Sequence, residues 1–383
     1  MKFLEAGFIN LIENTLFQTA PVYVQYYTTS RCNLRCEQCN VIYANADKRE
    51  LKTEGAFKVI DNLAKIGTSV VLLTGGEPFV RSDLPEIAGR AIDSGIHPRI
   101  QTNGLASIED LQRCANYGVR DISISLDSLA PHKQDFLNGG FANSWLAAIN
   151  TISNIGKTLG RDTFAAFGCV FSPYNFREVT NVIKFATEIG FWVSLVPAHS
   201  SSVFEPRSFS STKDNIKFDK SDYIEVDDVI GEVRAMKNEG YNIYDSDQYI
   251  DDLQRYVKGE RITWRDRNGG SCDAGSLYFA VLPDGSLAPC CDYRLPTQVD
   301  VGSDEFPENY RKSLHTSEIK KISKACTGCL YGSYPEISIS ARFAKAAIER
   351  VSLFSAESKA QIKVLTTDEL VLISEKISKG TRA

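Results

Sequence analysis

Strand-like and helix-like patterns alternate along the first 200 residues, and this alternation restricts the fold more than any other feature of the chain. Strands are predicted where β-branched and aromatic residues gather, at residues 22–29, 69–74, 99–102, 121–126, 165–171 and 192–196. Helical patterns fill the intervals, at residues 53–66, 83–94, 108–117, 144–159 and 176–189. Alternation of this kind predicts parallel βαβ units with right-handed crossovers. Six such strands predict an α/β fold built as an open or partial barrel.

Several polar or small residues come directly after a predicted strand. In parallel α/β folds the functional residues gather at the carboxyl ends of the strands. The residues in this position are Cys32, Gly75, Asn103, Asp127 and Pro197. We therefore expect them to converge on one mouth of the barrel.

Charge and hydropathy exclude several classes of protein. The net charge of −5 argues against a nucleic-acid partner, which would require a basic stripe. No apolar run approaches the roughly 20 residues needed to cross a bilayer. The first residues also lack the pattern of a signal peptide. A cytoplasmic location without a membrane partner is the expectation.

The chain contains 10 cysteines, and eight of them fall in two clusters. In a reducing cytosol such clusters indicate metal ligands rather than disulfides. The first cluster is Cys32, Cys36 and Cys39, in a loop that follows the first predicted strand. Three thiolates from one loop can bind three irons of a [4Fe–4S] cubane and leave the fourth iron without a protein ligand. An open metal position is typical of a catalytic site, although the spacing alone also suits a zinc site.

The spacing and placement of this triad resemble those of the radical S-adenosylmethionine (SAM) superfamily. The resemblance implies that SAM chelates the open iron, and that reduction of the cluster splits SAM to form a 5′-deoxyadenosyl radical. Cys32, Cys36 and Cys39 are then both the metal ligands and the catalytic core. The implied fold is a partial (β/α)6 radical SAM barrel with a small C-terminal α+β auxiliary-cluster domain.

Four later segments extend the resemblance. Residues 74–78 resemble the family's GGE segment, residues 101–104 its TNG turn, residues 123–127 its SLD segment, and residues 196–197 the strand end that contacts adenine. The residues that the resemblance assigns to SAM binding are Gly75, Gly76, Glu77, Pro78, Asn103, Ser125, Asp127 and Val196. One departure is Gln38, which stands where many members have an aromatic residue against adenine. We expect Val41 or Tyr43 to supply that contact.

The second cysteine cluster resembles an auxiliary-cluster domain of the SPASM or twitch type. It contains Cys272, the adjacent Cys290 and Cys291, and the pair Cys326 and Cys329. No cysteine follows Cys329, which favours the shorter twitch form with one auxiliary [4Fe–4S] cluster. The implied ligands are Cys272, Cys290, Cys326 and Cys329, with Cys291 as an alternative to Cys290. A zinc knuckle with four cysteines is the other interpretation.

The chain divides into five predicted regions. These are an N-terminal amphipathic helix at residues 1–20, the barrel at residues 21–200, a connector at residues 201–270, the auxiliary-cluster domain at residues 271–335 and a helical tail at residues 336–383. The connector is expected to contain helices near residues 226–238 and 246–258. A Pro-Asp-Gly turn at residues 283–285 predicts a β-hairpin in the auxiliary domain.

Radical SAM proteins with auxiliary domains often modify ribosomally made peptides, so we expect a precursor peptide as substrate. Crosslinking, C–C cleavage or oxidation are the expected outcomes, with the auxiliary cluster as electron acceptor. The expected partners are a separate leader-recognition protein and an electron donor such as flavodoxin or ferredoxin. One alternative is a dehydrogenase or epimerase of a small molecule such as an aminocyclitol or sugar. The non-enzymatic alternative is a zinc-stabilised binding module.

Two further side chains have two readings each. Cys169, on the fifth predicted strand, can donate a hydrogen atom to a substrate radical if it faces the barrel interior, and otherwise contributes to packing. His199, just past the sixth strand, can act as an acid or base at the mouth or as a hydrogen-bonded structural residue.

Overall fold

The computed structural model describes residues 13, 14, 17, 20–41, 49–199, 216–312, 316–353 and 361–380. The helix expected at residues 1–20 therefore lies outside the described residues except for four positions, and Tyr43 lies outside them entirely. None of the helices in the described ranges is both long and apolar enough to cross a membrane.

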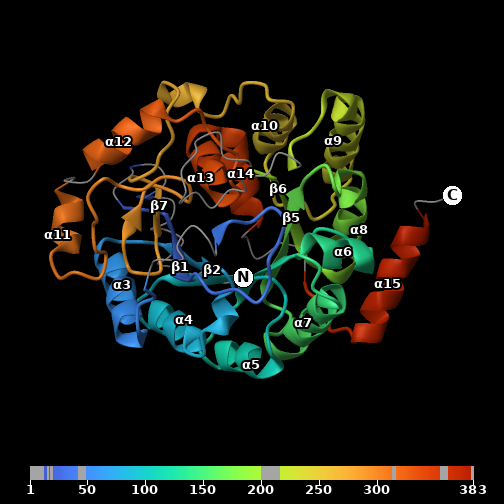
Figure 1. Cartoon of the computed structure of the whole chain (residues 1–383), viewed down its shortest axis with the longest axis horizontal. Coiled ribbons are helices and arrows are strands. Elements are labelled where there is room, and N and C mark those ends of the chain that lie inside the picture. Colours follow the sequence, from blue (N-terminus) through green and yellow to red (C-terminus); the bar gives the residue numbers. More distant parts are fainter. Residues whose placement is uncertain are drawn as a thin grey trace.

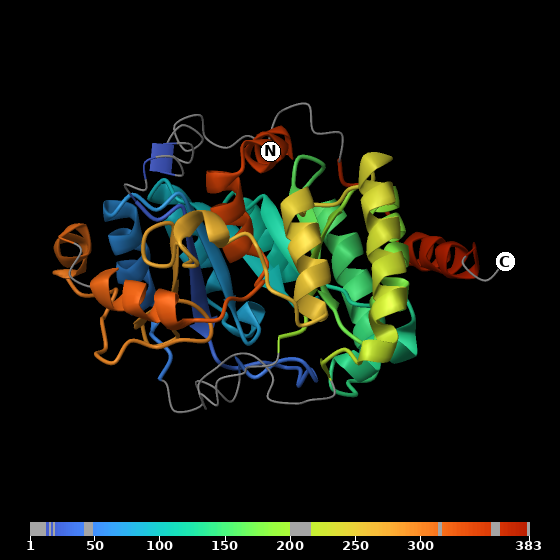
Figure 2. The same cartoon turned by 90° about the horizontal axis from the view of Figure 1, so that it is seen from above.

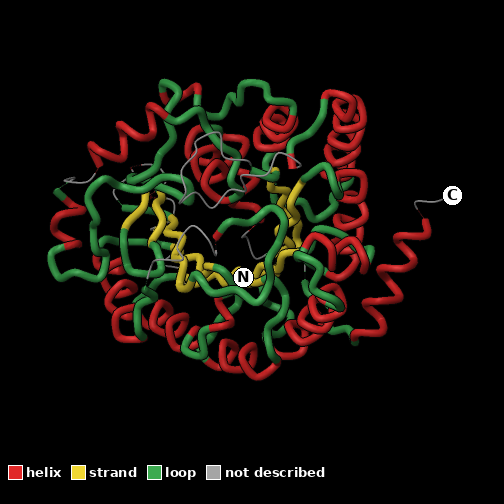
Figure 3. Tube along the Cα trace, in the orientation of Figure 1, coloured by secondary structure: helices red, strands yellow, loops and turns green. Residues whose placement is uncertain are grey.

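One sheet of eight strands organises the structure, in the order β6-β5-β4-β3-β2-β1-β7-β8. The first six strands confirm the predicted alternation and are parallel. Their bounds are β1 Tyr23–Thr29, β2 Val70–Gly75, β3 His97–Thr102, β4 Asp121–Ser125, β5 Phe164–Phe171 and β6 Trp192–Pro197. Figure 3 shows that the sheet curves into an open arc, as expected for a partial barrel.

Helices cover the outer, convex side of this arc (Figure 1). They are α3 Thr53–Lys65, α4 Leu84–Asp93, α5 Ile108–Asn116, α6 Pro131–Leu137, α7 Ser144–Thr158 and α8 Val179–Ile189. In α3 the apolar residues Val59, Ile60 and Leu63 are buried at helical spacing against the sheet. Strand β2 is buried along its whole length, as expected for a central parallel strand covered on both faces.

The remaining helices lie along the open side of the barrel and at the C-terminal end of the chain. They are α9 Tyr223–Asn238, α10 Asp247–Val257, α11 Phe306–Arg311, α12 Thr316–Ala325, α13 Ser333–Arg342, α14 Ala344–Leu353 and α15 Thr367–Gly380. The two helices predicted in the connector correspond to α9 and α10, which run side by side (Figure 2). Helix α15 packs on α7 and α8, outside the barrel.

The predicted hairpin of the auxiliary region is present as β7 Tyr278–Val281 and β8 Leu287–Ala288. It does not form a separate sheet, because β7 pairs in parallel with β1, with Tyr23 opposite Tyr278. This pairing covers the β1 edge, which would otherwise expose unpaired backbone groups. The second cysteine cluster is thereby attached directly to the first strand of the barrel.

Candidate functional site

The loop that carries Cys32, Cys36 and Cys39 follows β1 and is held by the glycine turn after β2. Gly76 N donates to the carbonyl of Thr29 at 2.9 Å, and Glu77 N donates to the carbonyl of Arg31 at 2.9 Å. A Cβ atom on Gly76 would lie 2.2 Å from the Arg31 carbonyl oxygen, so only glycine allows this approach. The GGE segment therefore fixes the start of the cysteine loop through its backbone.

In the loop, Cys32 and Cys36 are half-buried and Cys39 is exposed, and none of the three is in a disulfide. Cys32 Sγ accepts a bond from Leu34 N at 3.3 Å, and burial raises the pKa of Cys32 and of Cys36. Within the described ranges, no three Cys, His, Asp or Glu side chains are positioned to hold a single metal ion. The donor set, three cysteines on a loop with backbone N–H groups directed at sulfur, fits a cluster with one iron unbound by protein.

Glu77 joins the turn after β2 to the turn after β3. Its carboxylate accepts bonds from Thr102 Oγ1 at 2.9 Å, Asn103 N at 2.7 Å and Phe79 N at 3.0 Å. Burial raises its pKa to about 7, although these bonds favour the charged form. The carboxylate that the resemblance assigns to the SAM ammonium group thus faces three protein donors. The adjacent Pro78 is buried and begins a short helical turn.

Asn103 extends this connection to the cysteine loop. Its Nδ2 donates to Asn33 Oδ1 at 2.7 Å and lies 3.8 Å from Cys32 Sγ. Three of the predicted segments, at the ends of β1, β2 and β3, are therefore in contact around Cys32. This is the convergence expected at the carboxyl ends of parallel strands.

Asp127 holds the other end of the cysteine loop. Its carboxylate accepts bonds from Gln38 Nε2 at 3.1 Å and from Val170 N at 2.7 Å. Burial raises the pKa of Asp127 to about 7. Gln38, the departure from the family's aromatic residue, is thus a link between the loop and the end of β4. Ser125 pairs with Gly168 at the end of β4, and Ser123, two residues earlier on the same face of the strand, lines the barrel cavity.

A cavity of about 290 Å³ occupies the barrel interior beside the cysteine loop. Alternate residues of the strands point into it, as the period of a β-strand requires. The strand residues that line it are Tyr23, Gln25, Tyr27, Leu72, Arg99, Gln101, Ser123, Gly168, Val170, Ser194, Val196 and Pro197. Cys39 and Val41 of the first loop also line it, as do Cys291 and residues 331–333 of the auxiliary region. Of the two predicted adenine contacts, Val41 is therefore at the cavity.

Four cysteines of the second cluster line one small apolar cavity of about 30 Å³: Cys272, Cys290, Cys326 and Cys329. The neighbouring Cys291 lines the barrel cavity and is absent from the wall of this small cavity. The chain bends at this point, and the two thiols lie within hydrogen-bonding reach of each other. The arrangement favours Cys290 over Cys291 as the fourth member of the quartet, and four thiols from three segments fit a fully ligated cluster.

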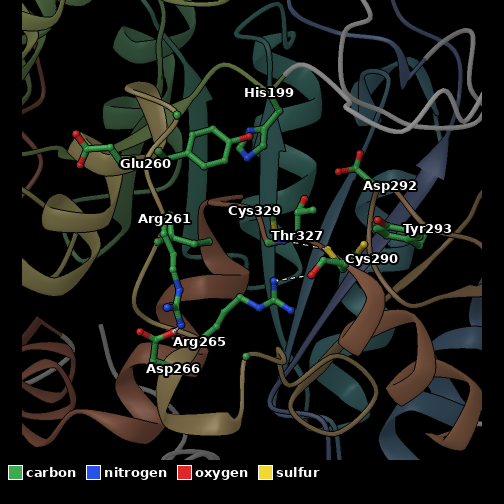
Figure 4. Close-up of a pocket in the computed structure, with 16 residues that line it drawn as sticks. His199, Glu260, Arg261, Arg265, Asp266, Cys290, Asp292, Tyr293, Thr327 and Cys329 are labelled. Atoms are coloured by element: carbon green, nitrogen blue, oxygen red, sulfur yellow. Dashed lines mark hydrogen bonds and ion pairs between the residues drawn. The ribbon is translucent and has the colours of Figure 1, made fainter.

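Three cysteines of the quartet, Cys290, Cys326 and Cys329, also border a larger cavity of about 720 Å³. Figure 4 shows Cys290, Thr327 and Cys329 in its wall. Arg265 reaches into this wall and was not identified from the sequence. Its guanidinium donates to the carbonyls of Cys326 at 2.9 Å and Ser323 at 2.8 Å. This buried cation binds the C-terminal end of α12, which leads directly into the cysteine pair.

His199 lies in the partition between the two cavities and lines both. Its Nε2 accepts a bond from Leu330 N at 3.1 Å, and its ring stacks on Tyr331 with centroids 3.8 Å apart. Burial lowers the pKa of His199 to about 4, so the ring is neutral. These contacts favour the structural reading of this residue over the acid–base reading.

The two isolated cysteines lie away from the cavities. Cys169 is fully buried among the core residues, while its strand neighbours Gly168 and Val170 face the barrel interior. Cys114 is buried in α5 and packs in the core. Cys169 is therefore not placed to donate a hydrogen atom to a substrate in the barrel.

A curved parallel α/β sheet with a three-cysteine loop at the carboxyl end of its first strand defines a class of enzymes that combine an iron–sulfur cluster with an α/β barrel. Residues 26–186 match the family model described as the Radical SAM superfamily. The chain therefore contains a radical SAM domain.

Three relatives give the range of similarity. Over 136 residues the chain is 37% identical to Fe-coproporphyrin III synthase of Methanosarcina barkeri, a match that covers 34% of this chain and 33% of that protein. It is 23% identical to the AdoMet-dependent heme synthase of Nitratidesulfovibrio vulgaris, over 81% of this chain and 88% of that protein. It is 24% identical to the PqqA peptide cyclase of Ruegeria pomeroyi, over 77% and 74%. In the first of these matches the chain spans only about a third of the relative's length.

Two solved structures share the fold. Streptococcus suis SuiB bound to precursor peptide SuiA superposes with a TM-score of 0.59 at 15% identity, covering 80% of this chain and 68% of that one. The structure of anSMEcpe with bound AdoMet gives 0.53 at 15% identity, covering 94% and 97%. At this level of identity the likeness concerns the fold alone.

Proposed function

We propose that this enzyme modifies a ribosomally made precursor peptide by radical chemistry, with a second [4Fe–4S] cluster bound by Cys272, Cys290, Cys326 and Cys329 as electron acceptor. The observation that carries the proposal is the barrel cavity, because a cysteine of the triad and residues adjacent to the quartet both line it. Cys39 lies on one side, and Cys291 and Tyr331, which follow members of the quartet, lie on the other. A substrate in this cavity would lie between the cysteine loop and residues next to the quartet.

The residues of the chain have distinct tasks in this proposal. When bound, the first cluster and SAM supply a radical that removes a hydrogen atom from the substrate. Asn103 and Gln38 hold the two ends of the cysteine loop. Glu77 accepts a bond from the backbone N–H of Asn103, and Asp127 accepts one from the side chain of Gln38. Val41 and Val196 offer apolar contacts for an adenine ring at the cavity wall.

The named relatives support peptide modification. The PqqA peptide cyclase and SuiB, which is bound to a precursor peptide, share sequence or fold with this chain. If the substrate is a peptide, a separate leader-recognition protein and a flavodoxin or ferredoxin are the proposed partners. If the purified enzyme binds the precursor tightly by itself, the proposal of a separate leader-recognition protein is wrong.

A second candidate function is a radical reaction on a small molecule, such as a dehydrogenation or epimerisation. The match to an AdoMet-dependent heme synthase favours it, because that match covers 81% of this chain and 88% of the relative. The two candidates differ in substrate and share the same cofactor sites.

Iron and sulfide counting tests the cluster assignment. Anaerobically reconstituted enzyme is expected to hold about eight irons, the content of two cubanes. A variant with Cys32, Cys36 and Cys39 all replaced by alanine should hold about four, as should Cys290→Ala. The matched control is Cys291→Ala, which should keep about eight. About four irons in the unmodified enzyme, or zinc without iron, refutes the second cluster.

The substrate is tested with reduced enzyme and SAM. Mass spectrometry should show a mass change in a short peptide encoded beside this gene. A mass change in a tetrapyrrole or sugar substrate, with none in the peptide, selects the second candidate instead.

A further inference from the structure

The barrel cavity contains one formal charge within the described ranges. Of the described residues that line it, Arg99 is the single lysine, arginine, aspartate or glutamate. Arg99 lies on β3, three residues before Thr102, whose hydroxyl bonds to Glu77 at the mouth. At about 3.3 Å per residue, Arg99 lies about 10 Å below the mouth, at the floor of the cavity.

The guanidinium of Arg99 is held in place by an ion pair and by two aromatic rings. Its Nε lies 3.4 Å from Asp121 Oδ1, while Asp121 itself does not line the cavity and also contacts His97 Nε2 at 3.1 Å. The rings of Phe164 and Tyr244 flank the cation, each with its centroid 5.4 Å from Cζ. The side chain is 11% exposed. The charge therefore meets the cavity in one fixed position, with its counter-ion outside.

Neutral donors surround this cation. The Tyr23 hydroxyl is buried beside the cavity, and the side chain of Ser333 is its polar neighbour there. Gln101 and Ser123 face the interior above Arg99, and Gly168 opposite them leaves space. Buried donors are stabilised by an acceptor, so the floor is suited to an acceptor that enters from the cavity.

We propose that this floor binds a carboxylate of the substrate. This inference rests on the proposed function and adds the chemical class that the site takes. A carboxylate is acceptor-only, and an arginine fork is the side chain best matched to its geometry. A substrate whose carboxylate is bound at Arg99 has its carbon atoms between the floor and the mouth of the cavity, next to the cysteine loop. The carboxylate can belong to an acidic side chain of a peptide or to a small organic acid.

Isothermal titration calorimetry on the oxidised, SAM-loaded holoenzyme tests this binding without turnover. The probes are N-acetyl-Ala-Glu-Ala-amide and its glutamine counterpart, and glutarate and glutaramide. The glutamate peptide should bind at least about ten-fold more tightly than the glutamine peptide, since a charge-assisted bond contributes about 1.5–3 kcal/mol. If glutarate shows the same preference over glutaramide, a small acid suffices. If only the peptides differ, the carboxylate is that of a peptide side chain.

The variant Arg99→Gln should remove the preference for the acidic probe. The matched control is Arg90→Gln, an exposed arginine of α4 that pairs with Asp61, which should keep the preference. Equal binding of the acidic and neutral probes by the unmodified enzyme, including no binding of either, overturns the inference even if Arg99→Gln fails to fold. Iron content and SAM affinity are measured in the same samples. If the enzyme holds no iron and does not bind SAM, the proposed function is refuted. If it does both but binds the acidic and neutral probes equally, the carboxylate site alone is refuted.

Discussion

Glu77 is a buried carboxylate whose removal should change how the stability of the ligand-free protein depends on pH. Burial raises its pKa from the ordinary value of 4.5 to about 7. The folded protein therefore holds this proton more tightly than the unfolded chain does. As the pH rises between 4.5 and 7, the unfolded chain releases the proton first, and stability is lost.

The size of the effect follows from the two pKa values. Linkage between 4.5 and about 7 gives a loss of about 2 kcal/mol between pH 5.5 and pH 8 from this one group. The variant Glu77→Gln has no proton to release and should lack this part of the pH dependence. At pH 5.5 its stability should be lower by about 1–3 kcal/mol, because the amide cannot accept the bonds from Thr102, Asn103 and Phe79 together. This difference should shrink by about 2 kcal/mol between pH 5.5 and pH 8.

Urea unfolding of the metal-free protein and the variant at pH 5.5, 7 and 8 measures both effects. The difference between the two proteins isolates Glu77 from the other buried carboxylates, such as Asp127 and Asp245. The control is Glu109→Gln, an exposed residue in the first turn of α5, which should keep the slope of the unmodified protein. Identical slopes for the Glu77→Gln variant and the unmodified protein refute the assignment of a raised pKa to Glu77.

Three further variants test other contacts. Gly76→Ala puts a methyl group 2.2 Å from the Arg31 carbonyl, so iron content should fall from about eight to about four as the first cluster is lost. Arg265→Gln breaks a bond to the Cys326 carbonyl worth about 1.5–3 kcal/mol, and reconstitution should then fill the triad while the auxiliary iron is lost. In His199→Phe the stacking area stays but an acceptor is removed, so the unfolding free energy at pH 7.5 should fall by about 1–3 kcal/mol. Because the pKa of His199 is lowered to about 4, the unmodified protein should also lose stability as the pH falls from 6.5 to 4, and the variant should lack this loss.

The barrel strands could be predicted because their signal is local. Buried parallel strands such as β2 are continuous apolar runs, and the intervening helices bury residues at a spacing of three and four. The hairpin at residues 278–288 was also predicted from its turn, yet its parallel pairing with β1 was not. That pairing joins segments about 250 residues apart, and no local pattern encodes which edge a short hairpin covers.

The residues of the candidate site also divide into those with a local sequence signal and those without one. The turns that follow β1 to β4 could be recognised because each motif is contiguous in sequence. The choice between Cys290 and Cys291 could not be made, since it depends on which face of the segment meets the barrel. Arg99 and Arg265 were missed because each acts on partners distant in sequence. For Arg99 a signal exists, namely polar residues at alternate positions, Arg99 and Gln101, in a strand that is otherwise buried.

The sheet order has a consequence for how the auxiliary region acts on the substrate cavity. Six barrel strands form an open arc, and the segment at residues 331–333, directly after Cys329, contributes to the wall of the cavity. Leu330 in the same segment is bonded to His199, just past the end of β6, while Tyr334 packs against Tyr23 at the start of β1. This segment therefore bridges the two edges of the arc. Metal binding by the quartet would fix its position, because bound ligands hold together the segments that carry them. The auxiliary cluster would then shape the substrate cavity as well as accept electrons, so its loss should weaken substrate binding even where no electron is transferred.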